Sequence, residues 1–343
     1  MSDGPFLTPS SAIITPNIIR HLLRVADDHG VSLDRALRAA SLTRESIDSP
    51  ALRVSYRQGR LIIEKALDSL PIPALGLEVG QRQPITASGV LGLAMMSSAT
   101  LLDAVELGMR FQNLAGSMVR WHSVIEGGSV VVTATVPDSE SPVSRFLVEE
   151  GFANITRMAR DVAGIRSPRH VELAFAPDGH ARSYADFFDC AIAFSAGRNA
   201  WHLPLSTARE PLPTAEPWTL AAMVAALEAE TRSVVERQEL VAVLAAHVED
   251  ALPVIRPLAD YARLLATSER TLRRRLIEVG SSYSRVLDDV RKRVAAELFA
   301  TPGLSTAEIS YRLGYEDERS LRRSTLRWFG ASPAALHDMA ARA

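Results

Sequence analysis

The chain has 343 residues, of which 47% are hydrophobic and 23% charged, with a formal net charge of −2. This length exceeds what one hydrophobic core usually serves and predicts two domains, and the near-neutral charge balance by itself names no partner. The longest stretch without a charged side chain, residues 83–102, contains Gln, Pro, Ser and Thr, so it is a poor membrane span. The single cysteine, Cys190, excludes an internal disulfide and a cysteine-based zinc site, and it suits a reducing cytoplasm.

The N-terminal half mixes helix and strand patterns. The opening residues MSDGPFLTPSS have no basic segment ahead of an apolar core, so we expect no secretory signal and a cytoplasmic location. Apolar residues at three- and four-residue spacing predict helices at 21–30, 32–41 and 56–70, and two packed helices within 89–115.

Strand patterns follow these helices. Residues 121–137 have β-rich runs on both sides of Gly127-Gly128, which predicts a hairpin. The next elements expected in chain order are a helix at 145–162, a strand at 170–175, a helix around 184–188 and a strand near 191–194. Because these strands are too irregularly spaced for a doubly wound sheet, we expect an α+β N-terminal domain.

A proline-rich segment marks the domain boundary. Residues 209–217, REPLPTAEP, carry three prolines in nine positions, and strand patterns disappear after them. The sequence therefore predicts domains at 1–210 and 236–343, joined by a linker with a helix at 211–235. The second domain is expected to be entirely helical. Residues 251–343 carry 16 basic and 11 acidic side chains, a modest positive excess.

One arginine-rich hexamer occurs twice in the second domain. ERTLRR at 269–274 is nearly repeated as ERSLRR at 318–323. Each copy follows a short helix and a turn, and Ser268 or Asp317 stands where a cap is needed. Gly314 can end the helix before the second copy, and Ser305-x-x-Glu308 predicts a capping box at the start of that helix. The pattern predicts two helix-turn-helix units.

The spacing within the hexamers separates two helix faces. Leu272 and Leu276 lie four residues apart and can face a core, while Arg270 and Arg274 lie four apart on another face. An Arg side chain can donate two hydrogen bonds to guanine, worth about 1–3 kcal/mol of discrimination. A single Arg pair is more typical of a solvated helix surface, but two copies in the same context favour DNA recognition.

The second copy repeats this arrangement with Leu321 inward and Arg319 and Arg323 outward. The neighbouring Arg273, Arg275 and Arg322 are placed to contact phosphates, which position a protein without specifying sequence.

A long amphipathic helix is expected between the two copies. Residues 283–300 contain no Gly or Pro, and Leu287, Val290, Val294 and Leu298 form an apolar stripe. A rigid helix of this kind would hold two recognition helices for major-groove faces about 34 Å apart.

The C-terminal 90 or so residues resemble the AraC/XylS family of transcription regulators. The resemblance rests on Ser268 to Leu276 and on the pattern GLSTAEISYRLGY…RWFGASP at 303–333. It implies that bases are recognised by Arg270, Arg274, Glu318, Arg319 and Arg323. Leu321 and Thr325 stand where the family usually has aromatic core residues, and the acidic run 316–318 is poorly suited to phosphates, which predicts weaker binding by the second unit.

The N-terminal part is similar to the arabinose-binding-like effector domain of one AraC subgroup. The similar stretches are GVSLDRALRAASL, GVLGLAMMSSATLLDAVELGMRF and YADFFDCAIAFSAGRNAWHLP. This resemblance implies a domain that senses a small molecule and helps the protein form a homodimer. Met95, Phe111 and Trp121 are candidate ligand-binding residues, although such residues more often form ordinary core.

The sequence shows no catalytic constellation. The eight histidines are scattered without metal-ligand spacing, and no nucleophile elbow, P-loop or dinucleotide motif occurs. We therefore expect no catalytic residue, cofactor or metal, and rank an enzyme last. The preferred hypothesis is a ligand-controlled DNA-binding regulator, with promoter DNA, a small-molecule effector, a second copy and RNA polymerase as partners, and no membrane. The alternative is a DNA-binding regulator whose N-terminal domain only dimerises.

Overall fold

The computed structural model describes residues 14–49, 52–138, 140–278 and 281–340. The opening residues that bear on a secretory signal lie outside these ranges. The chain divides into an N-terminal unit, Met1–Arg232, and a C-terminal unit, Ser233–Ala343. The division falls within one long helix, α11 (Pro217–Ala251), which is continuous across it.

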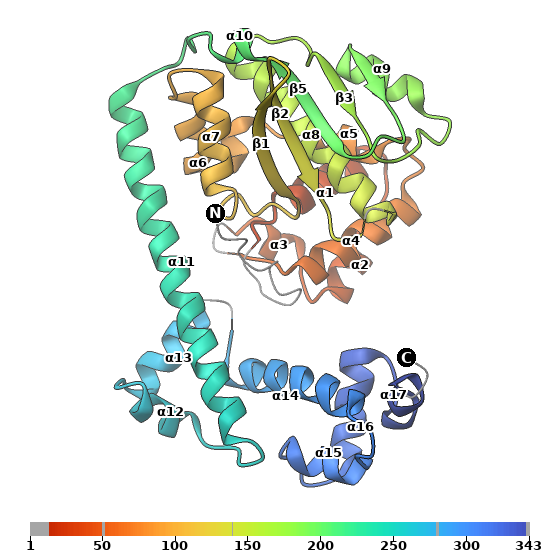
Figure 1. The fold of residues 1–343 in the computed structure, drawn as a ribbon, viewed down its shortest axis with the longest axis vertical. Helices are drawn as coiled ribbons and strands as arrows, with labels where there is room; N and C mark the ends of the chain where they lie inside the picture. The colour runs from red at the N-terminus through yellow and green to blue at the C-terminus, as the bar shows by residue number, and fades with distance from the viewer. Residues whose placement is uncertain (1–13, 50–51, 139, 279–280, 341–343) are drawn as a thin grey trace. The chain divides into compact units, whose positions relative to one another are not determined.

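The N-terminal unit is mixed α and β, as expected from the sequence (Figure 1). Its helices before α11 are α1 (Asn17–Asp28), α2 (Asp34–Ala39), α3 (Arg44–Ile47), α4 (Tyr56–Ser69), α5 (Leu75–Gly80), the 3-10 turn η1 (Ile85–Ser88), α6 (Val90–Met96), α7 (Leu101–Phe111), α8 (Pro142–Ala163), α9 (Ala181–Phe188) and α10 (Leu205–Ala208). Its strands are β1 (Arg120–Glu126), β2 (Ser129–Thr135), β3 (His170–Glu172), β4 (Ala191–Ala193) and β5 (Asn199–Pro204).

The five strands form one sheet in the order β1-β2-β5-β3-β4, with only β3 and β4 parallel. The predicted hairpin is confirmed, because Gly127 and Gly128 take the positive φ values of a tight turn between β1 and β2. The prediction missed β5, which pairs with both β2 and β3 at the centre of the sheet.

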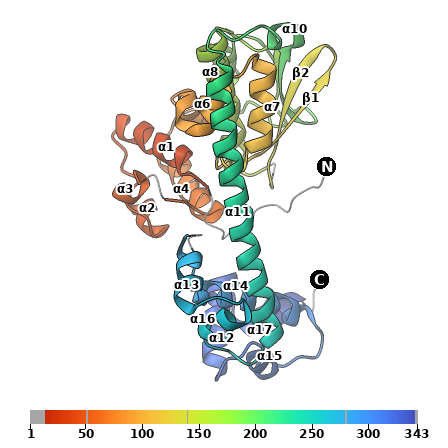
Figure 2. The ribbon, with the colours of Figure 1, turned by 90° about the vertical axis from the view of Figure 1, so that its left-hand side faces the viewer.

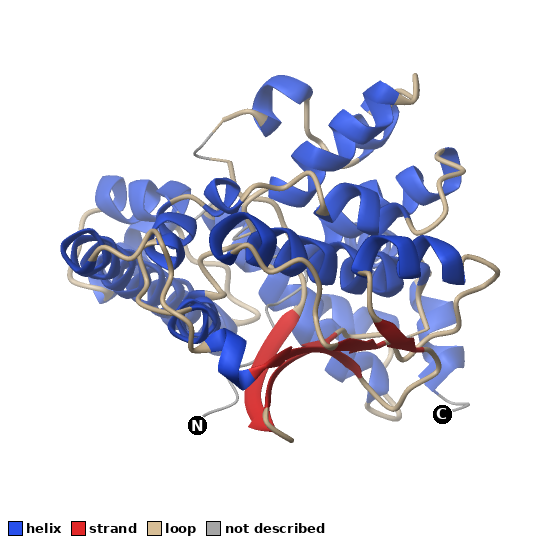
Figure 3. Ribbon diagram, turned by 90° about the horizontal axis from the view of Figure 1, so that it is seen from above, coloured by secondary structure: helices blue, strands red, loops and turns tan. Residues whose placement is uncertain are grey.

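The two faces of the sheet differ. Trp201 and Leu203 of β5 belong to the main apolar core, which also includes α8. Figure 3 shows the sheet nearly edge-on, with helices of this unit layered on one of its faces. Side chains alternate along a strand, so His202 points to the opposite face, which we call the outer sheet face.

The contact between α5 and α8 is close enough to bury two carboxylates. A Cβ added to Gly80 would stand 2.1 Å from the Glu150 carbonyl oxygen, so only glycine fits there. Glu149 accepts hydrogen bonds from Arg145 Nε at 3.0 Å and from the Tyr184 hydroxyl. Glu150 accepts from the side chain of Gln83, and burial raises the pKa of Glu150 to about 7.

The C-terminal unit is helical throughout the described residues, as expected. After α11 it contains α12 (Leu258–Leu264), α13 (Glu269–Glu278), α14 (Tyr283–Ala300), α15 (Thr306–Arg312), α16 (Glu318–Phe329) and α17 (Pro333–Ala340). Two helix-turn-helix units, α12–α13 and α15–α16, are joined by α14, whose bounds match the predicted helix. Of the predicted stripe on α14, Val290 is fully buried, with Leu287, Val294 and Leu298 partly buried against the two cores. No helix within the described ranges is long and apolar enough to span a membrane.

Candidate nucleic-acid interface

The first helix-turn-helix unit exposes its arginines on α13. Ser268 Oγ accepts a hydrogen bond from the Thr271 amide at 3.1 Å, which confirms the predicted cap. Leu272 and Leu276 are buried in the core shared with α12 and the end of α11. Arg270 and Arg274 are exposed on the other side of the helix.

Arg273 is also exposed and forms an ion pair with Glu269 one turn earlier. Such a surface pair is worth little, so Arg273 can exchange this carboxylate for a phosphate at small cost.

The second helix-turn-helix unit repeats this arrangement, but different residues cap its helices. The predicted capping box of α15 is present, and Gly314 ends α15 at a φ of +68°. Asp317 then caps α16 by accepting from the Ser320 amide at 2.6 Å. The Leu321 side chain is fully buried. The remaining predicted residues of α16, namely Glu318, Arg319, Arg322 and Arg323, are all exposed.

Thr325 occupies a core position in α16. Its side chain is fully buried, and its hydroxyl donates to the Arg322 carbonyl at 3.1 Å. The polar atom is therefore satisfied within its own helix, which removes the main penalty for placing threonine in a core.

Side chains of α14 contact both helices of the second helix-turn-helix unit. Arg291 donates to the carbonyls of Leu313 and Gly314 at 2.8 and 2.6 Å, and its guanidinium stacks over the Tyr315 ring. Trp328 of α16 donates through Nε1 to Asp288 at 3.0 Å. These contacts fix α15 and α16 against the helix that also packs on the first unit.

The three candidate ligand-binding residues do not all belong to one apolar cluster. Met95 and Phe111 belong to a small apolar cluster, formed by α6, α7 and the first part of α11, that includes Leu227. Figures 1 and 2 both show α6 and α7 beside this part of α11. Trp121 instead lies against α8, where its ring meets Gly151 and Phe152.

A hollow opens beside the Met95–Phe111 cluster. It has a volume of about 240 Å³, and its lining includes Arg20, Arg53, Leu91, Leu227 and Glu230. It therefore combines apolar walls with charged groups of both signs, and two of its walls are residues of α11.

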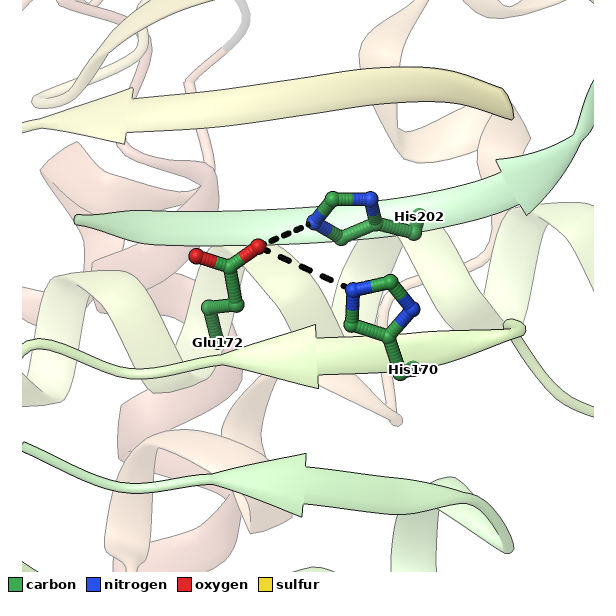
Figure 4. Close-up of side chains that lie close together, drawn as sticks. All are labelled: His170, Glu172 and His202. Carbon is green, nitrogen blue, oxygen red and sulfur yellow. Dashed lines mark hydrogen bonds and ion pairs between the residues drawn. The ribbon is translucent and has the colours of Figure 1, made fainter. Parts of the chain in front are cut away.

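A second polar cluster occupies the outer sheet face (Figure 4). His170 of β3 stands directly opposite His202 of β5, and Glu172 follows His170 on the same face of β3. Glu172 Oε1 lies 2.7 Å from His202 Nε2 and 3.7 Å from His170 Nε2. Arg198 Nε lies 3.3 Å from Glu172 Oε2.

These neighbours set the charge state of the cluster. Partial burial opposes ionisation of Glu172, but hydrogen bonds from Arg198 and His202 outweigh it and lower the pKa of Glu172. Burial and the nearby His170 lower the pKa of His202. Sequence inspection missed this cluster, because its histidines are 32 positions apart and meet only through strand pairing.

Two helix-turn-helix units with exposed arginines, attached to a domain of mixed α and β structure, define a DNA-binding regulator with a separate N-terminal domain. Comparison with known proteins gives the family. The model of the arabinose-binding domain of AraC transcription regulators matches residues 30–212, and a helix-turn-helix domain model matches residues 261–339. The chain belongs to the AraC family of transcription regulators.

Individual relatives extend over most of the chain. An ornithine utilization regulator of Pseudomonas aeruginosa is 31% identical over 91% of this chain and 93% of its own length. The HTH-type transcriptional regulator VirS of Mycobacterium tuberculosis is 27% identical over 79% of this chain and 81% of its own. The crystal structure of the transcriptional regulator CdpR from Pseudomonas aeruginosa is 26% identical, covers 89% of this chain and 96% of that one, and has a TM-score of 0.45.

Proposed function

We propose that this regulator recognises two adjacent major-groove segments through α13 and α16, and that a small molecule bound in the N-terminal unit controls this binding. The observation that carries the first part is the repeated arrangement of exposed Arg pairs opposite buried leucines. Arg270 and Arg274 contact bases in the first segment. Glu318, Arg319 and Arg323 contact the second, and Arg273 and Arg322 contact phosphates.

Duplex selection from a random pool by the full-length protein, at two salt concentrations, tests this proposal. We expect a site with two short sequence blocks about one helical turn, or 34 Å, apart. Recovery of only salt-sensitive binding without sequence preference would contradict base recognition by either unit.

Variants separate the two kinds of arginine. R270A/R274A should lose about 1–3 kcal/mol of binding free energy at DNA sites that the wild type prefers, and should relax the sequence preference in one block. R322A is the control, since loss of a phosphate contact should weaken all sequences about equally and lower the salt slope by about one. Unchanged preference in R270A/R274A would remove the role assigned to these residues.

The effector is assigned to the hollow beside α6 and α11. Its volume of about 240 Å³ suits a molecule of amino-acid size. Arg53 and Glu230, which form an ion pair at 4.0 Å, could exchange this contact for the carboxylate and the ammonium group of such a ligand, with Arg20 beside them. A relative is named for ornithine utilization, so ornithine belongs in the test panel. A ligand there would touch Leu227 and Glu230 of α11, the helix that continues into the DNA-binding unit.

A thermal-unfolding screen of amino acids and small carboxylic acids tests this assignment, because a ligand that binds only the folded state raises the unfolding temperature. We expect at least one compound to raise the unfolding temperature of the wild type and of M95A but not that of R53A. A hit that is unaffected by R53A would place the effector elsewhere. Absence of any hit would favour the alternative, in which the N-terminal unit only joins two copies.

A further inference from the structure

We propose that His170, Glu172 and His202 form a binding site for a divalent transition-metal ion on the outer sheet face. Two imidazole nitrogens and one carboxylate oxygen are donors that suit Zn²⁺, Co²⁺, Ni²⁺ and Cu²⁺, whereas Mg²⁺ and Ca²⁺ prefer oxygen ligands alone. These three side chains are the group within the described residues whose donor atoms all lie within 4.8 Å of one another.

The backbone fixes the three ligands. His170 and His202 are direct partners in the antiparallel pairing of β3 with β5, so their side chains emerge side by side. The Arg169 amide donates to the His202 carbonyl at 2.8 Å and holds this register. Glu172 is two residues after His170 and therefore shares its face. Placement on paired strands gives a more rigid donor set than a loop would.

The distances are close to those around a metal ion. Bonds of 2.0–2.2 Å place two ligand atoms about 3–3.5 Å apart. The separations from Glu172 Oε1 are 2.7 Å to His202 Nε2 and 3.7 Å to His170 Nε2, each within about 1 Å of this range, and all three donor atoms lie within 4.8 Å of one another. The imidazole rings are stacked with centroids 3.7 Å apart. The His170 ring, whose side chain is 37% exposed, must rotate to direct its nitrogen at the same ion.

The charged groups around the cluster favour the binding of a cation. Arg198 reaches two carboxylates, Glu172 at 3.3 Å and Glu126 at 3.1 Å, so one positive charge faces two negative ones. Figure 4 shows that a single oxygen of Glu172 faces both histidines. Arg198 contacts both oxygens of Glu172, Oε2 through Nε at 3.3 Å and Oε1 through Nη2 at 3.4 Å. A metal ion on Oε1 would replace the longer contact, and the contact to Oε2 would orient the carboxylate, as outer-sphere partners of metal ligands do. The exposed side of His170 leaves a position for water as a further ligand.

Titration of the untagged, full-length, chelator-treated protein with ZnCl₂ and CoCl₂ tests the site. Calorimetry should show one ion bound per chain, and Co²⁺ should give visible absorption bands from nitrogen and oxygen coordination. H170A and E172Q should each weaken binding by more than about 100-fold, since removal of outer-sphere partners alone costs 10–100-fold. H122A is the matched control, because His122 is an exposed histidine on the same face in β1.

Thermal unfolding without metal verifies that each variant is folded. The proposal would be overturned by no Zn²⁺ uptake at micromolar concentration, or by uptake that persists in H170A and E172Q. It would also be overturned if histidine NMR signals of the cluster respond to pH but not to Zn²⁺, since the cluster would then bind only protons. If H122A lost as much Zn²⁺ affinity as H170A and E172Q, the ion would be binding non-specifically to the surface.

Discussion

Cys190 illustrates how the surroundings of one residue decide its chemistry. Burial of the thiol, followed by the adjacent negative charge of Asp189, raises the pKa of Cys190 to about 11. The reactive thiolate is therefore scarce at neutral pH. We expect the folded protein to react with a disulfide reagent at pH 7.5 at least tenfold more slowly than glutathione, and the urea-unfolded protein to react at a rate near that of glutathione. A folded-state rate similar to that of glutathione would contradict a raised pKa of the Cys190 thiol.

Glu150 makes the stability of the N-terminal unit depend on pH. Its folded-state pKa of about 7 lies above the ordinary value of 4.5, so the folded state binds the proton more tightly than the unfolded state. Between these values the free energy of unfolding falls as pH rises, by at most about 3 kcal/mol. The loss is complete above pH 7, where the buried carboxylate is ionised.

E150Q should remove this dependence. Urea unfolding at pH 5 and pH 8 should show a smaller decrease in E150Q than in the wild type, because the glutamine stays neutral and can still accept from Gln83. E78Q, a variant of a partly buried α5 carboxylate that pairs with Arg82, provides the comparison and should keep the wild-type decrease. Equal pH dependence in E150Q and wild type would contradict the buried-proton explanation.

Sequence alone predicted the residues whose environment is set within one helix. Leu272 and Arg270 face opposite sides of α13 because of helical periodicity, which local spacing reveals. His170 and His202 could not be paired in this way, because strand register depends on the whole sheet. Met95, Phe111 and Trp121 were grouped by proximity in sequence, but the structure places Phe111 and Trp121 in different apolar clusters, with Met95 packed against both.

At the scale of elements, Arg291 connects α14 to the end of α15. Its two hydrogen bonds reach carbonyls of Leu313 and Gly314, at the helix terminus where carbonyls lack intrahelical partners. R291A should lower the free energy of unfolding of the second helix-turn-helix unit by about 1–3 kcal/mol. Faster amide hydrogen exchange in α15 would report this loss directly.

R293A is the matched control for R291A. Arg293 lies on the same helix and pairs with Glu249, but it is half exposed, and surface pairs contribute about 0–1 kcal/mol. If R291A and R293A changed exchange in α15 equally, the effect would come from α14 itself and not from the two carbonyls.

The helices and the strands of this chain differ in how far sequence predicts them. The α14 pattern persists for five turns without Gly or Pro, so its bounds were predicted directly. The sequence of β5, NAWHLP, is short and contains Asn and Pro, which are uncommon in strands. It is a central strand because β2 and β3 supply partners on both sides, and that information is not local.

At the scale of the whole molecule, α11 is the covalent path between the hollow that we propose for the effector and the helix-turn-helix units. Leu227 and Glu230 line the hollow, while Leu244 and Val248 of the same helix belong to the core of the first helix-turn-helix unit. A ligand can alter DNA binding only if it interacts differently with two states of the protein. A helix anchored in both units can transmit such a difference as long as it stays unbroken.

Ser233 stands in α11 at the division between the units, between these two anchors. S233P should break the helix there, because proline removes one backbone hydrogen bond and clashes with the preceding turn, at a cost of about 3 kcal/mol. Operator affinity and effector-induced stabilisation should both persist in S233P, whereas the change in operator affinity on adding effector should disappear. S233A, which preserves the helix, should respond like the wild type in the same titration of labelled operator with and without effector. If the effector changed the operator affinity of S233P as much as that of the wild type, α11 would not couple the two units. Effector control would then act through association of two copies instead.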